Sequence, residues 1–118
     1  MINKKRLVHL TRRLLAIESE NPPGNEYKIA NFVAKFLKDL GLKVKTYEFA
    51  KKRPNVVAIL KGKTSKRPLL LSPHLDTVPA GRGWRFHPYK AKVYNGRIYG
   101  RGATDCKGNV AVALEVIN

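Results

Sequence analysis

The chain opens with two stretches in which apolar side chains recur at helical spacing. A turn of sequence Asn-Pro-Pro-Gly, residues 21–24, separates them and predicts the end of the first helix. Asn25 is expected to cap the second helix and Gly41 to end it. Residues 4–18 and 26–40 therefore predict two amphipathic helices, whose apolar stripes are Leu7, Leu10, Leu14 and Ile17, then Ile29, Phe32, Val33, Phe36, Leu37 and Leu40.

The middle of the chain changes to shorter patterns that are typical of β-strands. Residues 42–49 alternate in polarity and residues 55–60 are largely apolar, so each predicts a strand. Residues 68–72 contain three consecutive leucines, which fits a strand buried on both faces. Residues 93–99 predict a hairpin around an Asn-Gly turn. Residues 107–117 are apolar nearly all round and predict a buried helix, so the pattern indicates an α/β fold.

Length and composition limit the class of protein. The chain has 118 residues, of which 43% are hydrophobic and 27% charged, as in one small folded domain or part of a larger one. No apolar run approaches the roughly 18 residues that span a bilayer. A single cysteine, Cys106, excludes an internal disulfide framework. Arg12 and Arg13 interrupt the apolar stretch near the start, so we expect a cytoplasmic protein without a signal peptide.

The charge is the unusual feature of the composition. Lys and Arg total 24 against 8 for Asp and Glu, which gives a net charge of +16. A field of this sign attracts nucleic acids and other polyanions. The basic residues are spread along the whole chain, however, and aromatic residues do not alternate with them as a base-stacking surface requires. We expect a solvated basic surface, with a nucleic-acid-binding module as the alternative.

The first candidate for chemistry lies directly after the predicted buried strand. His74 and Asp76 alternate in an extended chain, so both side chains can lean to the same side. A neutral imidazole binds a metal through one nitrogen, and a nearby carboxylate can hold the proton on the other. His74 as ligand and Asp76 as its orienting partner therefore form a sensible pair. The alternative is that His74 ends the strand and Asp76 makes a turn with Thr77.

The second candidate is the glycine-rich stretch before the last predicted helix, residues 99–108. Its glycines allow close approach of the backbone, and Asp105 lies where that helix begins. An aspartate at a helix N-terminus is often a cap or a partner of the helix dipole, worth about 1 kcal/mol. The spacing does not match the phosphate-binding loop of nucleotide-binding proteins.

Taken together, the two candidates resemble a known family. The chain resembles the acetylornithine deacetylase, succinyl-diaminopimelate desuccinylase and aminoacylase family of co-catalytic zinc peptidases. Three stretches carry the resemblance: His-Leu-Asp-Thr-Val-Pro at residues 74–79, Trp84, and Gly-Arg-Ile-Tyr-Gly-Arg-Gly-Ala-Thr-Asp-Cys-Lys-Gly at residues 96–108. The order of predicted elements is also similar over nearly the whole chain. The resemblance implies the N-terminal half of a zinc-peptidase catalytic domain, with a mixed sheet flanked by helices. Residues 1–118 would be a partial catalytic domain with no second domain.

The resemblance also implies roles for three residues. His74 would be a ligand of one zinc ion, Asp76 the catalytic-site residue that orients its imidazole, and Asp105 the carboxylate that bridges two zinc ions, or cobalt in their place. Two such metals would hold a hydroxide and polarise the scissile amide. Family members commonly have a cis peptide after the bridging aspartate, so we expect one at Asp105–Cys106.

The sequence departs from the family pattern at several positions. Pro73 stands where glycine often precedes the histidine, and Cys106 stands where methionine is usual. Cys106 is a candidate for a soft extra zinc ligand, but a small buried residue is the preferred interpretation. His87 lies where the family tends to have an acidic residue and is interpreted as a loop side chain. His9 is expected on the surface of the first helix.

The implied activity is that of a metallopeptidase or deacylase of amino-acid biosynthesis. The enzyme would hydrolyse the amide bond of N-acyl amino acids or small peptides. The family's general-base glutamate and further metal ligands are expected beyond Asn118, and Glu115 is expected to be structural. We therefore predict that the isolated chain is inactive. The alternative is a truncated, non-catalytic remnant that needs a partner, and its exposed sheet edges would then favour self-association into a homo-oligomer.

Overall fold

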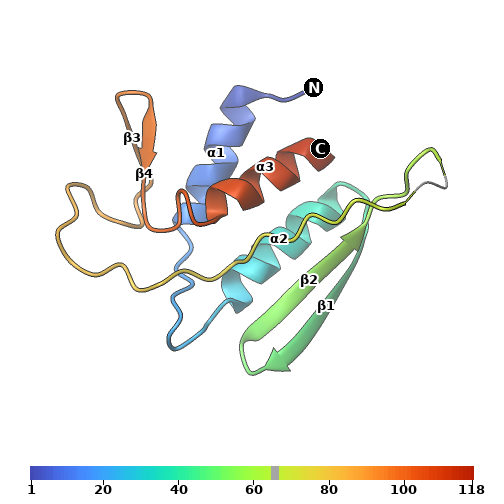
Figure 1. The fold of residues 1–118 in the computed structure, drawn as a ribbon, viewed down its shortest axis with the longest axis horizontal. Coiled ribbons are helices and arrows are strands. Elements are labelled where there is room, and N and C mark those ends of the chain that lie inside the picture. The colour runs from blue at the N-terminus through green and yellow to red at the C-terminus, as the bar shows by residue number, and fades with distance from the viewer. Residues whose placement is uncertain (65–66) are drawn as a thin grey trace.

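A computed structural model describes residues 1–64 and 67–118 of the chain (Figure 1). Helices and short antiparallel sheets together confirm the α/β class that the sequence predicts. The elements of the described residues follow one another in the order α1 (Lys4–Leu15), α2 (Tyr27–Asp39), β1 (Lys43–Ala50), β2 (Arg53–Ile59), β3 (Lys92–Tyr94), β4 (Arg97–Tyr99) and α3 (Lys107–Ile117).

The first two helices form where the apolar stripes predict them. The side chain of Asn3 caps α1 by accepting a hydrogen bond from the backbone N–H of Arg6 at 3.1 Å. Gly41 follows the end of α2 with φ of 83°, as expected for a glycine after a helix. The predicted cap at Asn25 is wrong, because Glu26 occupies the N-cap position without a capping hydrogen bond. The Glu26 carboxylate instead pairs with Arg53 at 2.7 Å.

The strands of the described residues form two separate antiparallel hairpins. β1 pairs with β2 from Lys43↔Ile59 to Ala50↔Arg53, and β3 pairs with β4 around the predicted Asn95-Gly96 turn. Both turn residues have positive φ, 47° and 71°, which the favoured two-residue hairpin turn requires. Parallel pairing among the described residues is limited to an isolated bridge, Glu20↔Thr77. That bridge joins the chain after α1 to the loop that carries the candidate site.

The predicted buried strand at residues 68–72 is not formed in this structure. This stretch is extended but has no strand partner among the described residues, and the side chains of Leu69 and Leu70 are 85% and 83% exposed. A strand that is apolar on both faces needs a pairing partner and cover on each face, and neither is present here. The sequence prediction was therefore wrong for the local environment of this segment.

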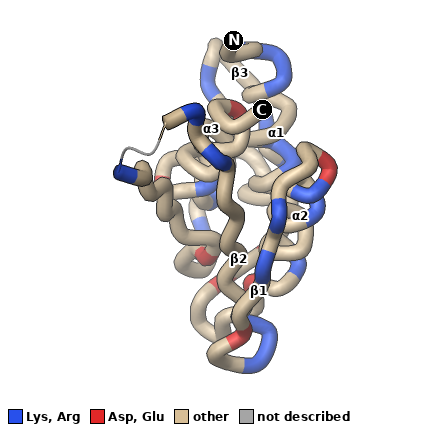
Figure 2. Tube along the Cα trace, turned by 90° about the vertical axis from the view of Figure 1, so that its right-hand side faces the viewer, with Lys and Arg blue, Asp and Glu red and all other residues tan. Residues whose placement is uncertain are grey.

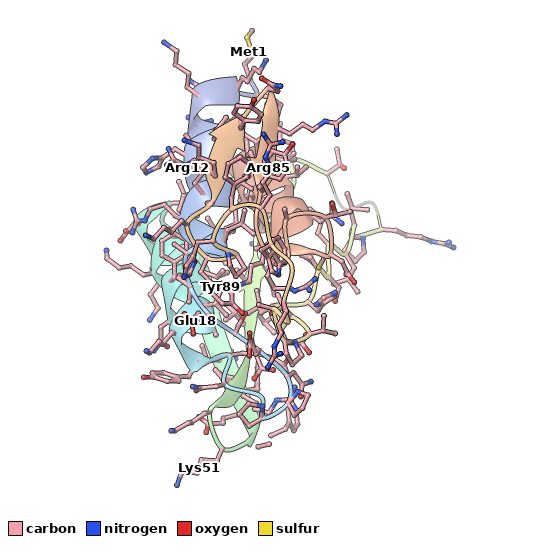
Figure 3. The ribbon with its side chains drawn as sticks, turned by 90° about the vertical axis from the view of Figure 1, so that its left-hand side faces the viewer. Met1, Arg12, Glu18, Lys51, Arg85 and Tyr89 are labelled. Carbon is pink, nitrogen blue, oxygen red and sulfur yellow. The ribbon has the colours of Figure 1, made fainter. Side chains whose placement is uncertain are left out.

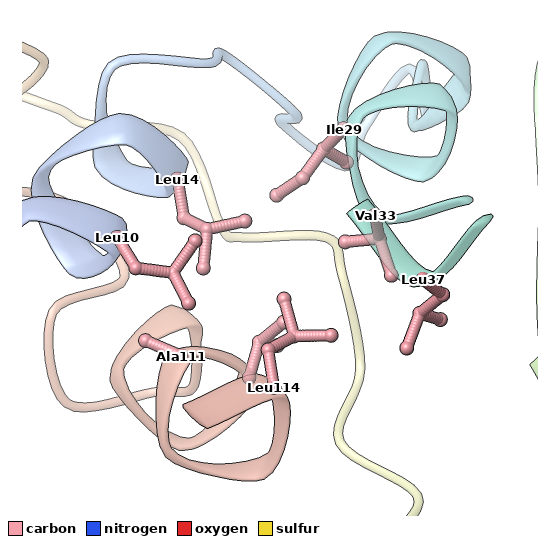
Figure 4. Packing of buried hydrophobic residues seen from close by; sticks show 8 residues of the cluster. Leu10, Leu14, Ile29, Val33, Leu37, Ala111 and Leu114 are labelled. Carbon is pink, nitrogen blue, oxygen red and sulfur yellow. The ribbon is translucent and has the colours of Figure 1, made fainter. Parts of the chain in front are cut away.

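The hydrophobic core lies where the three described helices meet. Leu10 and Leu14 of α1 pack against Ala111 and Leu114 of α3, and the apolar stripe of α2 packs on them (Figure 4). The β1–β2 hairpin covers the other side of α2 through partly buried residues such as Val44, Val56 and Ala58. The buried cluster consists of Leu10, Leu14, Ile29, Val33, Leu37, Val110, Ala111 and Leu114.

The last helix is only half buried, which corrects the prediction of a fully buried helix. Val112 and Val116 are 48% and 60% exposed, while Glu115 is buried. The Glu115 carboxylate accepts hydrogen bonds from both the Arg6 guanidinium, at 2.6 and 2.7 Å, and the backbone N–H of Asn3, at 2.7 Å. Arg6 holds the pKa of the Glu115 carboxyl below its usual range. Glu115 thus joins α1 to α3, in agreement with the structural role expected for it.

The long loop between the candidate site and β3 is held in part by the carboxylate of Glu20. Glu20 accepts hydrogen bonds from the hydroxyl of Tyr89 and from the backbone N–H of Ala80, the latter at 2.9 Å. Tyr89 lies midway along the molecule, between Met1 near one end and Lys51 at the other (Figure 3). The hydrogen bond from Tyr89 is the main cause that lowers the pKa of Glu20 below its ordinary value of 4.5.

This contact predicts a pH-dependent stability. A lowered native pKa means that the stabilising contribution of Glu20 is present above pH 4.5 and is lost as the pH falls through the native pKa. When the pH is lowered from about 7 to about 3, we expect the urea concentration at the unfolding midpoint to decrease. The decrease should be smaller in Glu20→Gln than in the wild type. Glu48→Gln, at an exposed carboxylate of β1, is the matched control and should leave the wild-type decrease in place. An equal decrease in wild type and Glu20→Gln would contradict the assigned role.

The basic residues are distributed over the surface of the described chain. Lys and Arg lie along α1 and α2 and at the turn between β1 and β2, and they form no single strip (Figure 2). The lysine of α3, Lys107, is buried. No helix among the described residues combines the length and apolar character needed to cross a membrane. A nucleic-acid-binding role stays an untested alternative.

Candidate metal centre

The loop that carries His74 and Asp76 is fixed by the chain that follows α1. The backbone N–H of Thr77 donates to the carbonyl of Ser19 at 2.9 Å, and the N–H of Asn21 donates to the carbonyl of Thr77 at 2.7 Å. The hydroxyl of Ser19, which is fully buried, donates to the carbonyl of Leu75 at 2.7 Å. Residues 74–77 are therefore held against the end of α1 on one side.

The turn before α3 brings Asp105 to this loop. Gly102 has φ of 86°, and a Cβ there would lie 2.8 Å from the side chain of Thr77, so the close approach of the two loops requires glycine. The backbone N–H of Lys107 donates to the carbonyl of Gly102 at 2.8 Å and closes the turn. The Asp105–Cys106 peptide bond is cis, as the family resemblance predicts.

The imidazole of His74 lies between two carboxylates. Its Nε2 is 2.8 Å from Oδ1 of Asp105, and its Nδ1 is 3.1 Å from Oδ1 and 3.0 Å from the backbone oxygen of Asp76. The contact with Asp105 is the main cause that raises the pKa of His74 above 6.5. The structure thus brings together the three residues that the sequence singled out, although Asp105 is 31 positions away from His74.

Asp76 is held in place by a residue that the sequence analysis treated only as part of a turn. The side-chain amide of Asn21 donates to Oδ2 of Asp76 at 3.0 Å, while Oδ1 faces His74. This amide is the main cause that lowers the pKa of Asp76, so the carboxylate stays charged and its orientation is fixed. The Pro-Pro sequence after Asn21 suggested only a helix stop, and no spacing rule connects residue 21 with residue 76.

Cys106 lies beside His74 and Asp105, but its thiol already donates a hydrogen bond. His74, Asp105 and Cys106 are the group of potential metal ligands among the described residues whose ligand atoms lie within 4.8 Å of one another. The thiol of Cys106 is 7% exposed and donates to the carbonyl of His74 at 3.3 Å. Burial raises the pKa of this thiol, which disfavours the thiolate that a metal requires. The geometry agrees with the interpretation of Cys106 as a small buried residue.

Lys107 is a site neighbour that the sequence analysis did not single out. Its side chain is fully buried, and its ammonium donates to the carbonyl of Ile17 at 2.5 Å. Burial lowers the pKa of Lys107 to about 8. The stem of Lys107 also lies where a Cβ on Gly102 would contact it, at 3.2 Å. Lys107 therefore packs against the turn that carries Asp105. Its burial depends on tertiary contacts, so the sequence pattern did not predict it.

Two other histidines lie outside this group of potential ligands. His87 lies in the loop before β3, where its Nδ1 accepts a hydrogen bond from the N–H of Tyr89 at 3.2 Å. His9 is exposed on α1. Both positions agree with the sequence interpretation of a loop side chain and a surface side chain.

The donor set suits a divalent transition metal. An imidazole nitrogen and a carboxylate oxygen face each other at 2.8 Å, and the Asp105 side chain is 86% exposed, so a cation and its further ligands have access. The second imidazole nitrogen already has a carboxylate partner, which is the arrangement that orients histidine ligands in metal sites. The residues present therefore fit one side of a zinc or cobalt site.

Comparisons with known proteins agree with the motifs. A sequence model of peptidase family M20/M25/M40 matches residues 70–118. The chain is 35% identical over 117 residues to N-formyl-4-amino-5-aminomethyl-2-methylpyrimidine deformylase of Halalkalibacterium halodurans. The alignment covers 95% of the chain and 27% of the relative. It is 31% identical over 121 residues to succinyl-diaminopimelate desuccinylase of Orientia tsutsugamushi, with coverage of 99% and 30%.

A third relative is named for another activity. The chain is 38% identical over 104 residues to acetylornithine deacetylase of Vibrio atlanticus. The alignment covers 85% of the chain and 27% of the relative. The chain thus spans 27 to 30% of the length of these three relatives. The matched segment contains His74, Asp76 and Asp105, so the chain is similar to peptidase family M20/M25/M40 over the part that carries the candidate site.

Proposed function

We propose that this chain is the metal-binding N-terminal part of the catalytic domain of an amidohydrolase. The observation that carries the proposal is the imidazole of His74 between the carboxylates of Asp105 and Asp76. In the proposed site His74 and Asp105 would hold the metal, and Asp105 would serve both ions of a two-metal centre. Asp76 is the positioning residue, and residues 1–118 supply part of one domain.

The metal would supply Lewis-acid chemistry, since a bound zinc ion polarises a carbonyl oxygen and makes water a stronger nucleophile near neutral pH. The chain's own residues prepare that site. In the neutral imidazole whose Nδ1–H donates a hydrogen bond to Asp76, the lone pair of Nε2 faces Asp105 and can bind the metal. Asn21 fixes Asp76, and the Ser19 and Thr77 contacts fix the loop that carries both residues.

The substrate class follows from the relatives. The names of two of them specify removal of a succinyl or an acetyl group from an amino acid, and a third name specifies removal of a formyl group. We infer that the full-length protein hydrolyses the amide bond of an N-acyl amino acid or a small peptide in the cytoplasm. The excess of Lys and Arg, 24 against 8 acidic residues, suits substrates that carry carboxylates.

The 118-residue chain by itself should bind metal and show no turnover. A catalytic zinc takes about three protein ligands plus water, and the described residues offer His74 and Asp105. We expect calorimetric titration with Zn²⁺ or Co²⁺ to show saturable binding. We also expect no zinc-dependent hydrolysis of N-acetyl or N-succinyl amino acids above the rate without protein. Absence of metal binding would refute the proposed centre, and zinc-dependent hydrolysis would refute the predicted inactivity.

A further inference from the structure

One hollow on the surface gathers basic side chains from two segments that are distant in the sequence. His9, Arg12 and Arg13 are three and four positions apart on α1, so they share one face of that helix. Lys90, from the loop before β3, lines the same hollow. The hollow has a volume of about 270 Å³, and its lining consists of His9, Arg12, Arg13, Ala16, Lys90 and Ala91.

The two guanidinium groups of the hollow are held in place by contacts that leave donors free. Nε of Arg12 donates to the carbonyl of Ala91 at 3.1 Å and so ties α1 to the loop. The guanidinium of Arg13 lies over the ring of Phe32 on α2, 4.9 Å from the ring centroid. A guanidinium fixed by one nitrogen or by its flat face keeps further N–H groups available in its plane. These groups are therefore oriented before any ligand binds.

The acidic residues of the chain do not neutralise this hollow. All eight lie in the described part of the chain, and none forms an ion pair with the basic residues of the hollow. Figure 3 shows Glu18, the acidic residue closest to Arg13 in the sequence, well away from Arg12 and toward the middle of the molecule. The dipole of α1 favours cations in its last turn, but it does not account for Lys90. The gathered positive charge thus lacks a partner within the described residues.

We propose that this hollow binds the diphosphate group of a small phosphorylated compound. Arg12, Arg13 and Lys90 supply three positive charges, and the imidazole of His9 supplies a further hydrogen-bond donor. One phosphate group carries a charge of about −1.5 to −2, so a single phosphate leaves part of this charge unmatched and two linked phosphates match it better. The forked donors of arginine also suit phosphate oxygens, which they bind in pairs.

The size of the hollow limits what it can hold. Sites that enclose a whole drug-sized ligand have volumes of about 300–1,000 Å³, and this hollow lies just below that range. It therefore suits the two phosphates, while the rest of the compound would lie on the surface. Inorganic pyrophosphate and the end of a nucleoside diphosphate share this chemistry. The inference is independent of the proposed amidohydrolase, because no residue of the hollow belongs to the candidate metal centre.

Titration with pyrophosphate tests the proposal in metal-free buffer at pH 7 and constant ionic strength. We expect calorimetry to show saturable binding of one pyrophosphate per chain, and binding of inorganic phosphate that is weaker by about tenfold or more. Arg12→Gln and Lys90→Gln should each weaken pyrophosphate binding by about tenfold, because each removes a charge-assisted hydrogen bond. Both side chains are exposed, and Lys90 lies outside the helices, so the Lys90→Gln variant is expected to keep the fold.

The matched control is Arg82→Gln. It removes the same charge from an exposed loop position outside the hollow and should leave the affinity for pyrophosphate unchanged. Adenosine diphosphate distinguishes the two sources of the diphosphate. Affinity equal to that of pyrophosphate would show that the phosphates alone are held, and higher affinity would show that the nucleoside adds contacts. Either result supports the site.

Three outcomes would overturn the proposal. The first is the absence of saturable pyrophosphate binding. The second is an equal loss of affinity in Arg82→Gln and Arg12→Gln, which would show that only the net charge of +16 attracts the anion. The third is tighter binding of a single-stranded oligonucleotide, weakened equally by both variants, which would assign the basic surface to nucleic acid. None of these titrations contains metal, so the metal centre is tested separately.

Discussion

Replacing Asp105 by asparagine is expected to weaken Zn²⁺ or Co²⁺ binding by about 100-fold or more. The substitution keeps the size of the side chain and removes the charge that faces His74 Nε2 at 2.8 Å. Loss of an outer partner of a metal ligand typically costs 10- to 100-fold in affinity, and loss of a ligand itself should lie at or above the upper end. Calorimetric titration of the folded variant measures the change, and His74→Gln should behave in the same way.

Matched variants separate a metal-binding role from a general loss of charge. Asp39→Asn removes an exposed carboxylate of α2 that pairs with Lys35, and should leave metal affinity unchanged. Asn21→Ala removes the amide that holds Asp76 and should weaken binding by about tenfold, as expected for an outer partner. In the metal-free Asp105→Asn variant the pKa of His74 should fall, because Asp105 is the main cause that raises it. Unchanged metal affinity in Asp105→Asn would remove Asp105 from the site.

Truncation of the core at Leu14 is expected to have the largest effect on stability. Leu14 is fully buried between α1, α2 and α3, so Leu14→Ala leaves a cavity in the centre of the molecule (Figure 4). Substitutions of this kind cost about 2–5 kcal/mol of unfolding free energy. For a domain whose total stability is about 5–15 kcal/mol, this loss brings the chain close to unfolding. Urea denaturation followed by circular dichroism measures it.

The matched control makes the same chemical change on the surface. Leu60 is 63% exposed just after β2, and Leu60→Ala should change the unfolding free energy by no more than about 0.5 kcal/mol. A similar loss in both variants would show that the three-helix cluster is not the centre of stability. A small loss in Leu14→Ala would lead to the same conclusion.

The sequence predicted those features that depend on local pattern. The stripes of the first two helices, the Asn95-Gly96 hairpin and the glycine after α2 all follow from side-chain spacing or from backbone preferences of single residues. His74, Asp76 and Asp105 were singled out because their motifs are distinctive, and the fold places their side chains together. The cis peptide at Asp105–Cys106 was expected from family resemblance and not from spacing.

The features that the sequence did not predict depend on contacts between distant segments. Asn21 belongs to a turn motif, and its role beside Asp76 arises because the chain after α1 pairs with Thr77. Three consecutive leucines at residues 69–71 predicted burial, but burial needs neighbouring strands that a local pattern does not specify. The cap expected at Asn25 failed because Glu26 occupies the N-cap position before Tyr27, and its side chain pairs with Arg53.

The pairing of α1 with α3 has a consequence for how the polypeptide acquires its shape. Arg6 and Glu115 are 109 positions apart, so the first helix finds its buried ionic partner only after residue 115 has been synthesised. Until then the leucines of α1 have no α3 to pack against. Contacts with such large separation slow folding and prolong the exposure of apolar surface. A released chain that ends before residue 107 should therefore be a better substrate for chaperones than one that ends after residue 117.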